Sequence, residues 1–126
     1  MAQVNQLGRV IIPVSDQDAA IAWYTEKLGF TVSADVPFGE GDRWVEVSPP
    51  GGGAAIALSN GMGEFQPGRE TGIALTTSDA RAAHEELKSQ GVEAEEPMGG
   101  DGTVPLLFMF KDGDGNGLMI VEDDAS

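Results

Sequence analysis

The sequence of 126 residues contains no cysteine and a single histidine, His84. The absence of cysteine excludes disulfides, thiolate metal sites and cysteine nucleophiles together. With one histidine, the chain shows no pairing of nucleophile and base of the kind that covalent catalysis requires. His84 lies beside the apolar stripe of the second predicted helix and on the outer face of that helix, so we predict a packing or surface role. No catalytic residue is assigned.

Basic residues are also scarce, since 7 Lys and Arg face 21 Asp and Glu, for a net charge of −14 and a pI of about 4.1. Such a field repels phosphate backbones and anionic lipids, which argues against nucleic acid and membrane surfaces as partners. No apolar run approaches the length of a membrane span, and residues 1–9 lack the apolar core of a signal peptide. We therefore expect a cytoplasmic protein whose acidity serves solubility.

Two stretches of the chain, 9–32 and 72–94, repeat the same order of residue types. Each reads as a short apolar strand, a Ser-Asp helix start, an amphipathic helix, a glycine and a second strand. Asp16 aligns with Asp79, an offset of 63 residues, which is half of the chain. Half of so small a domain cannot bury its own sheet face. The repeat therefore predicts two similar modules within a single domain.

The predicted fold class is α+β, with two βαβββ modules that form a cupped, partly open mixed-sheet barrel with outer helices. Ser15 and Asp16 are predicted to cap the first helix and Ser78 the second, while Gly29 and Gly91 end them. The modules span about 5–58 and 71–123, with a glycine-rich linker over 59–70. Predicted strands cover 7–14, 31–36, 43–47, 54–58, 72–77, 92–96, 104–111 and 118–122.

Three segments resemble the vicinal-oxygen-chelate superfamily, the group of glyoxalases, bleomycin-resistance proteins and extradiol dioxygenases. They are VSDQDAAIAWYTEKLGF at 14–30, SDARAAHEELKSQGV at 78–92 and DGDGNGLMIVE at 112–122. The last differs from the pattern of the family at Gly113, where proline is usual. The resemblance covers nearly the whole chain in order, and it implies the fold more specifically than the activity, because this fold hosts many activities.

The resemblance also implies which positions of this chain correspond to the metal ligands of the metal-using members. The matching positions here are Arg9, Gly72, Met119 and, in the fourth case, Ile56 or Ala57. None of these side chains offers the carboxylate or neutral imidazole that divalent metals prefer. We therefore predict that the protein uses no metal and no other cofactor.

The alternation of side chains along strands predicts which residues share the face of Arg9. A glutamate is rarely buried beneath a helix, so Glu46 and its strand neighbour Trp44 are placed on that face. For 104–111 the pattern allows either Leu106, Phe108 and Phe110 or Leu107 and Met109. The predicted ligand-binding residues are Arg9, Ile11, Trp44, Glu46, Ile56, Ala74, Thr76, Phe108, Met119 and Val121.

This set describes an apolar groove with few charges, which is typical of a small-molecule site. A plain core of the same residues is the alternative. Arg9 either pairs with Glu46 or holds an oxyanion of the ligand through its planar fork of donors.

The favoured function is metal-independent binding of a small aromatic or cationic molecule, by a protein that resembles those that sequester bleomycin. The resemblance implies a homodimer. One alternative is a glyoxalase-, isomerase- or dioxygenase-like enzyme with a metal on unorthodox carboxylates such as Glu46 and Glu122. Another is a module without a ligand, acting through partners.

Residues 112–123 match the spacing of a calcium-binding EF-hand loop. That loop requires a helix on each side, whereas the strand-like LLFMF precedes this one. We predict a turn between two strands and no calcium site.

Overall fold

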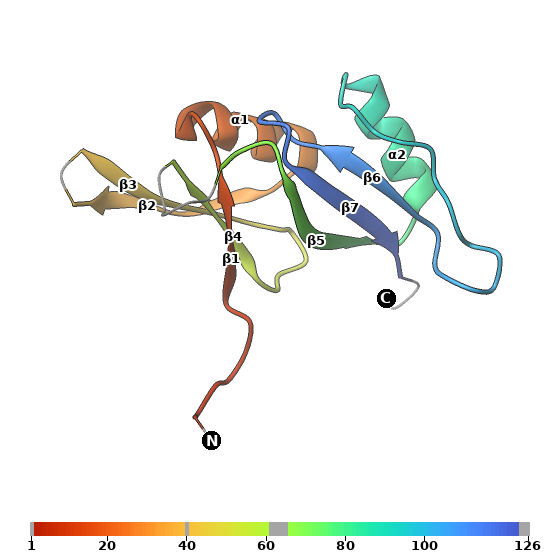
Figure 1. The fold of residues 1–126 in the computed structure, drawn as a ribbon, viewed down its shortest axis with the longest axis horizontal. Helices are drawn as coiled ribbons and strands as arrows, with labels where there is room; N and C mark the ends of the chain where they lie inside the picture. The colour runs from red at the N-terminus through yellow and green to blue at the C-terminus, as the bar shows by residue number, and fades with distance from the viewer. Residues whose placement is uncertain (1, 40, 61–65, 124–126) are drawn as a thin grey trace. The chain divides into compact units, whose positions relative to one another are not determined.

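The structure, a computed structural model, describes residues 2–39, 41–60 and 66–123 (Figure 1). The chain divides into two compact units, Met1–Pro67 and Gly68–Ser126. Their boundary lies within the segment 59–70 predicted as a linker, of which residues 61–65 lie outside the described residues. Neither helix in the described part of the chain is long and apolar enough to cross a membrane.

The first unit has the predicted βαβββ order. Its elements are β1 (Arg9–Pro13), α1 (Gln17–Leu28), β2 (Thr31–Phe38), β3 (Asp42–Ser48) and β4 (Ala55–Ser59). The four strands form one sheet in the order β1-β4-β3-β2, in which β1 runs parallel to β4 and the other neighbours are antiparallel.

Helix α1 begins and ends where its capping residues predict. The Asp16 side chain accepts a hydrogen bond from the backbone N–H of Ala19, and Gly29 closes the helix in the left-handed conformation, with φ at 72°. Tyr24 is 1% exposed and packs edge-on against Phe30, with ring centroids 5.9 Å apart. This helix therefore covers one face of the first sheet with an aromatic core.

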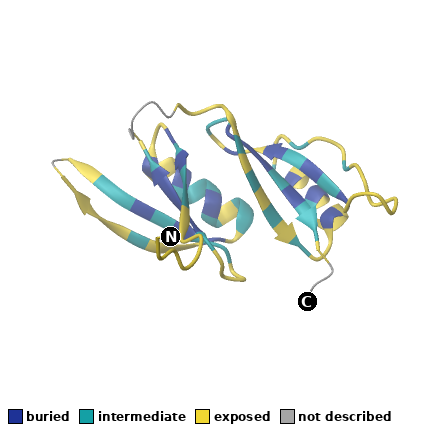
Figure 2. Ribbon diagram, turned by 60° about the horizontal axis from the view of Figure 1, so that its bottom comes forward, coloured by how far each residue is buried: buried dark blue, intermediate teal, exposed yellow. Residues whose placement is uncertain are grey.

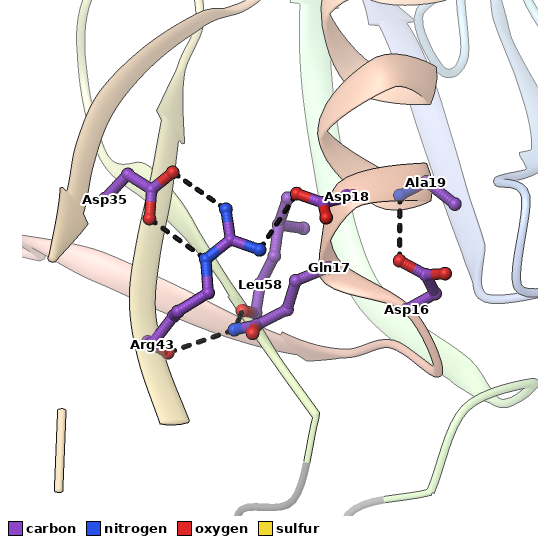
Figure 3. Close-up of polar contacts among 7 residues, drawn as sticks. All are labelled: Asp16, Gln17, Asp18, Ala19, Asp35, Arg43 and Leu58. Atoms are coloured by element: carbon purple, nitrogen blue, oxygen red, sulfur yellow. Dashed lines mark hydrogen bonds and ion pairs between the residues drawn. The ribbon is translucent and has the colours of Figure 1, made fainter. Parts of the chain in front are cut away.

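A polar cluster ties the start of α1 to the sheet (Figure 3). The Arg43 guanidinium on β3 binds both carboxylate oxygens of Asp35 on β2 and one of Asp18 on α1. The hydrogen bond from Arg43 holds the pKa of the Asp35 carboxyl below its usual value. Beneath it, the buried Gln17 amide donates to the backbone carbonyls of Arg43 and Leu58. These contacts place α1 on the face of the sheet that carries Arg43.

The second unit contains β5 (Glu70–Thr77), α2 (Ala80–Ser89), β6 (Leu107–Lys111) and β7 (Gly117–Glu122). Its sheet has the order β5-β7-β6, with β5 parallel and β6 antiparallel to β7. The cap of α2 is Asp79 rather than the predicted Ser78, because the Asp79 carboxylate accepts from the backbone N–H of Ala82. Glu122 accepts from the N–H of Ala80 and supplies a second partner for this helix start.

The predicted strand at 92–96 is not formed, and this prediction is wrong. The segment makes only isolated bridges, Ala94 to Phe110 and Met98 to Leu107, and the register shifts by one residue between them. Pro97 lies between the two bridges and has no N–H to donate to the ladder. Over residues 68–123, the second unit therefore has three strands instead of the predicted four.

Buried residues concentrate between each helix and its own sheet (Figure 2). By contrast, β2 is exposed along nearly its whole length, including Val36 at 51% and Phe38 at 59%. The predicted α+β class is confirmed. The cupped barrel concerns the relation between the two units and stays a prediction.

Candidate functional site

The face of the first sheet opposite α1 carries Arg9, and we call it the Arg9 face. The register places Ala55 beside Arg9 and Ala57 beside both Ile11 and Glu46. Trp44, two residues before Glu46 on β3, points to the same side. The sequence prediction for Arg9, Ile11, Trp44 and Glu46 therefore agrees with the register of the sheet.

Glu46 is the centre of a small polar cluster on the Arg9 face. Arg9 Nε donates to Glu46 Oε2 at 2.8 Å, and Trp44 Nε1 donates to the same oxygen at 2.6 Å. Arg9 lies on β1 and Glu46 on β3, so the arginine reaches across β4, where Ala55 and Ala57 are small enough to leave room. The Arg9–Glu46 ion pair that the sequence allowed is present.

The two partners of this ion pair differ in their contact with solvent. The Arg9 side chain is 52% exposed and that of Glu46 only 12%. An ion pair with one well-solvated partner contributes at most about 1 kcal/mol to stability. The arrangement therefore orients side chains more than it stabilises the fold.

The bond from Trp44 to Glu46 was not predicted from the sequence. A signal was present, because residues two apart on a strand share a face and a half-buried indole N–H needs an acceptor. The bond fixes the plane of the indole and holds the carboxylate toward Arg9.

An aromatic and aliphatic patch adjoins this cluster, and sequence reasoning missed it. Phe38 packs edge-on against Trp44 with ring centroids 6.0 Å apart, and Val36 pairs directly with Trp44. Both are more than half exposed. An irregularity between Val32 and Ala34 resets which residues of β2 face the same side as Trp44, and spacing alone does not reveal such a bulge.

Ile56 lies on the wrong face for a role beside Arg9, so this prediction is corrected. It pairs with Val10 and Val47, on the side that α1 covers, and is 2% exposed. Of the two residues considered, Ala57 is the one on the Arg9 face. The parallel register between β1 and β4 decides this, and it depends on strands that are far apart in sequence.

In the second unit, one face of the sheet carries most of the predicted residues. Met119 pairs with Ala74, and Val121 pairs with Thr76. The side chains of Ala74 and Thr76 are exposed, while those of Met119 and Val121 are half-buried. Their neighbours on β6 are Met109 and Leu107, which is the second of the two arrangements that the sequence left open.

Phe108 belongs to the opposite face, and its prediction as a ligand-binding residue is corrected. It is 0% exposed and meets the His84 ring of α2 edge-on, with centroids 5.1 Å apart. His84 itself is 7% exposed, and its Nε2 finds no hydrogen-bond partner among the described residues. Both residues therefore pack between α2 and the sheet. Of the packing and surface roles predicted for His84, packing is the one observed, and its predicted place on the outer side of the helix is corrected.

The residues at the four positions of the family's metal ligands do not fit a metal. They supply a guanidinium already paired with Glu46, a glycine, a thioether and a methyl group, at Arg9, Gly72, Met119 and Ala57. In the described ranges, no three His, Cys, Asp or Glu side chains gather closely enough to hold an ion. The unorthodox carboxylates Glu46 and Glu122 are both engaged, by Arg9 and Trp44 and by the start of α2.

The turn at 112–117 uses its polar groups to hold itself together. Asp112 Oδ1 accepts from the backbone N–H groups of Asp114 and Asn116, and Asp112 Oδ2 accepts from Asn116 Nδ2. Asn116 Oδ1 in turn accepts from the N–H of Gly68. The turn joins β6 to β7, with no helix on either side.

We expect calcium to leave the melting temperature unchanged, because the Asp112 oxygens already accept internal hydrogen bonds. A ligand that binds only the folded protein must stabilise it. Thermal unfolding with 1 mM CaCl₂ (about a hundred times a sensor-type Kd) and with 1 mM EDTA checks this. A rise in melting temperature with calcium alone would contradict it.

Residues 6–120 match the profile of the Glyoxalase/Bleomycin resistance protein/Dioxygenase superfamily, and the chain belongs to this superfamily. The uncharacterized protein YetH of Bacillus subtilis (strain 168) is 33% identical over 122 residues, which cover 94% of this chain and 99% of that protein.

Two solved structures share both the fold and about a third of the sequence. TnmS3, an antibiotic binding protein from Streptomyces sp. CB03234, is 32% identical with a TM-score of 0.83, covering 97% of this chain and 98% of that one. A superfamily member from Sphaerobacter thermophilus DSM 20745 is 31% identical with a TM-score of 0.88, covering 95% and 98%.

Proposed function

We propose that this protein binds a small, partly aromatic molecule on the Arg9 face without the help of a metal. One observation carries the proposal: the Trp44 indole is held by Glu46 beside Arg9 and next to the exposed ring of Phe38. Orientation of an aromatic ring by a polar contact at its edge is what a binding site for flat molecules requires. The likeness to the antibiotic-binding TnmS3 supports the same class of function.

Binding is favoured over catalysis by the chemistry of the site. The positions that would hold a metal carry no suitable donors, so the glyoxalase- or dioxygenase-like alternative lacks its electrophile. Glu46 is the one carboxylate in the cluster, and its Oε2 accepts from both Arg9 and Trp44. A general base needs an acidic proton beside an electrophilic centre, and this face offers no such centre.

The proposal extends to the rest of the predicted set and to the assembly. Ala74, Thr76, Met119 and Val121 remain proposed contacts for the ligand, on the face of the second sheet that α2 does not cover. The protein is proposed to act as a homodimer in the cytoplasm.

Nuclear magnetic resonance can test the proposal, because each tryptophan gives one indole N–H signal and the chain has only Trp23 and Trp44. Titration with 2-naphthalenemethanol, a neutral fused-ring compound, should move the Trp44 signal in a saturable way, with a Kd below about 1 mM. The Trp23 signal, from α1 on the opposite side of the sheet, should stay in place. The Trp44→Phe variant assigns the signal, and Trp23→Phe isolates it. A stationary Trp44 signal would contradict the proposal for this compound class.

Metal independence is tested separately on the purified protein. We expect well under one equivalent of zinc, iron or nickel per chain, because the ligand positions carry no carboxylate or imidazole. Treatment with EDTA should leave the affinity for 2-naphthalenemethanol unchanged. A near-stoichiometric metal whose removal abolishes binding would refute the metal-free function.

A further inference from the structure

The geometry points to a ligand that carries an acidic oxygen, such as a carboxylate or phenolate, beside its aromatic ring, with Arg9 as the residue that recognises it. This inference rests on the proposed function and specifies the ligand class of the same face. It runs against the net charge of −14, which by itself would favour a cation.

The first support is that most of the donors of Arg9 are unused. Its Nε binds Glu46, and the guanidinium makes no other hydrogen bond or ion pair to a described residue. With respect to the described part of the chain, both terminal nitrogens therefore keep their N–H groups available. These two nitrogens form the planar fork that binds a carboxylate through two parallel hydrogen bonds.

Arg43, on the other face of the same sheet, offers a comparison, because it is an arginine whose contacts hold the fold together. Its Nε and both terminal nitrogens are all bound to Asp35 and Asp18 (Figure 3). Arg43 lies on the side that α1 covers, and each of its three nitrogens is already bound to a carboxylate, so its fork is occupied. The contrast identifies Arg9 as the arginine of the first unit with recognition capacity left.

The second support is that Glu46 orients Arg9 and is itself poorly placed to bind a cation. Its Oε2 already accepts two hydrogen bonds, and its side chain is only 12% exposed. A cationic ligand would therefore meet a carboxylate whose charge is already paired with the Arg9 guanidinium. An acceptor oxygen, by contrast, meets an anchored guanidinium whose orientation is already set, which lowers the entropy cost of binding.

The third support is the position of the aromatic surface. Trp44 shares the Glu46 oxygen with Arg9, so the indole and the guanidinium are neighbours, and Phe38 and Val36 extend the apolar surface along β2. A ring that packs on this surface therefore brings a substituent at its edge to the terminal nitrogens of Arg9.

The test compares three probes of one shape: 2-naphthoate, neutral 2-naphthalenemethanol and cationic 2-naphthylmethylamine. Affinities come from the Trp44 indole shift at neutral pH. We expect 2-naphthoate to bind about tenfold more tightly than either other probe, as a charge-assisted fork would provide. Arg9→Gln should remove this preference, and Arg9→Lys should restore only part of it because an ammonium lacks the fork.

The matched control is Arg81→Gln on the exposed surface of α2, which changes the net charge equally and should leave all three affinities unchanged. Tighter binding of the amine, or a preference for naphthoate that survives Arg9→Gln, would overturn the inference while leaving the proposed function intact. If none of the three probes moves the Trp44 signal, the proposed function fails as well. Equal melting temperatures of the variants exclude loss of the fold as the cause.

Discussion

Replacement of Asn116 by aspartate should cost about 3–5 kcal/mol of unfolding free energy at neutral pH, as expected when a buried charge loses its partner. Asn116 is 1% exposed, and its Nδ2 donates to Asp112 Oδ2 at 3.0 Å. Asn116→Asp keeps the shape but puts a second acceptor-only carboxylate against the first. Two carboxylates at this distance cannot both ionise without a large penalty.

Urea unfolding followed by circular dichroism measures the effect. The matched control is Asn60→Asp, the same chemical change at an exposed position of the first unit, which should lie within about 0.5 kcal/mol of the parent. Equal stabilities for Asn116→Asp and Asn60→Asp would show that the turn at 112–117 does not depend on its internal hydrogen bonds.

A similarly large loss is expected for Gln17→Glu at the start of α1. The Gln17 amide is 6% exposed and donates to the backbone carbonyls of Arg43 and Leu58 at 3.0 and 2.9 Å. A carboxylate there has no donor and faces two acceptors. An acidic residue in the first helical turn gains only about 0.3–1 kcal/mol from the helix dipole. A buried charge without its partner costs about 3–5 kcal/mol, so the loss dominates.

The loss at Gln17→Glu should depend on pH in a defined direction. Burial against two carbonyls raises the pKa of the new carboxyl in the folded state above its unfolded value of about 4.3. The penalty is therefore present in full well above that folded pKa, and it declines as pH falls toward about 4. It does not vanish, because a protonated carboxyl restores only one of the two donors.

Unfolding of this variant between pH 4 and 8 checks the direction, with Gln66→Glu at an exposed position as the control. If the difference in unfolding free energy between the two variants stays constant over this pH range, the role of the buried amide is refuted. Melting temperatures suffice where denaturant curves are incomplete.

Much of the first unit could be predicted from local patterns. Asp16 and Gly29 mark the ends of α1 in the sequence and in the structure, because caps act on backbone groups only a few residues away. The alternation of side chains placed Trp44 and Glu46 on one face, and the bond between Arg9 and Glu46 follows from that placement. The family could also be recognised, from three segments spread in order between residues 14 and 122, and the family profile matches residues 6–120.

Apart from the cap of α2, which is Asp79 and not Ser78, the errors concern pairing between distant segments. Ile56 and Phe108 were assigned to the wrong faces, because the facing of a strand depends on its register with a partner and on which side the helix packs. The strand at 92–96 is missing because the pairing shifts by one residue around Pro97, and the place of Phe38 beside Trp44 depends on the irregularity between Val32 and Ala34.

By itself, therefore, the sequence determined the repeat, the α+β class, the ends of α1 and the absence of suitable metal ligands at the family's positions. These follow from residue types and from contacts within a few positions along the chain. Only the tertiary structure decided that Trp44 and Arg9 share one oxygen of Glu46, that the terminal nitrogens of Arg9 bind no described residue, and that Ala57 and not Ile56 shares their face of the sheet. Those facts depend on strand register, which is set by hydrogen bonds between strands more than forty positions apart in the case of β1 and β4.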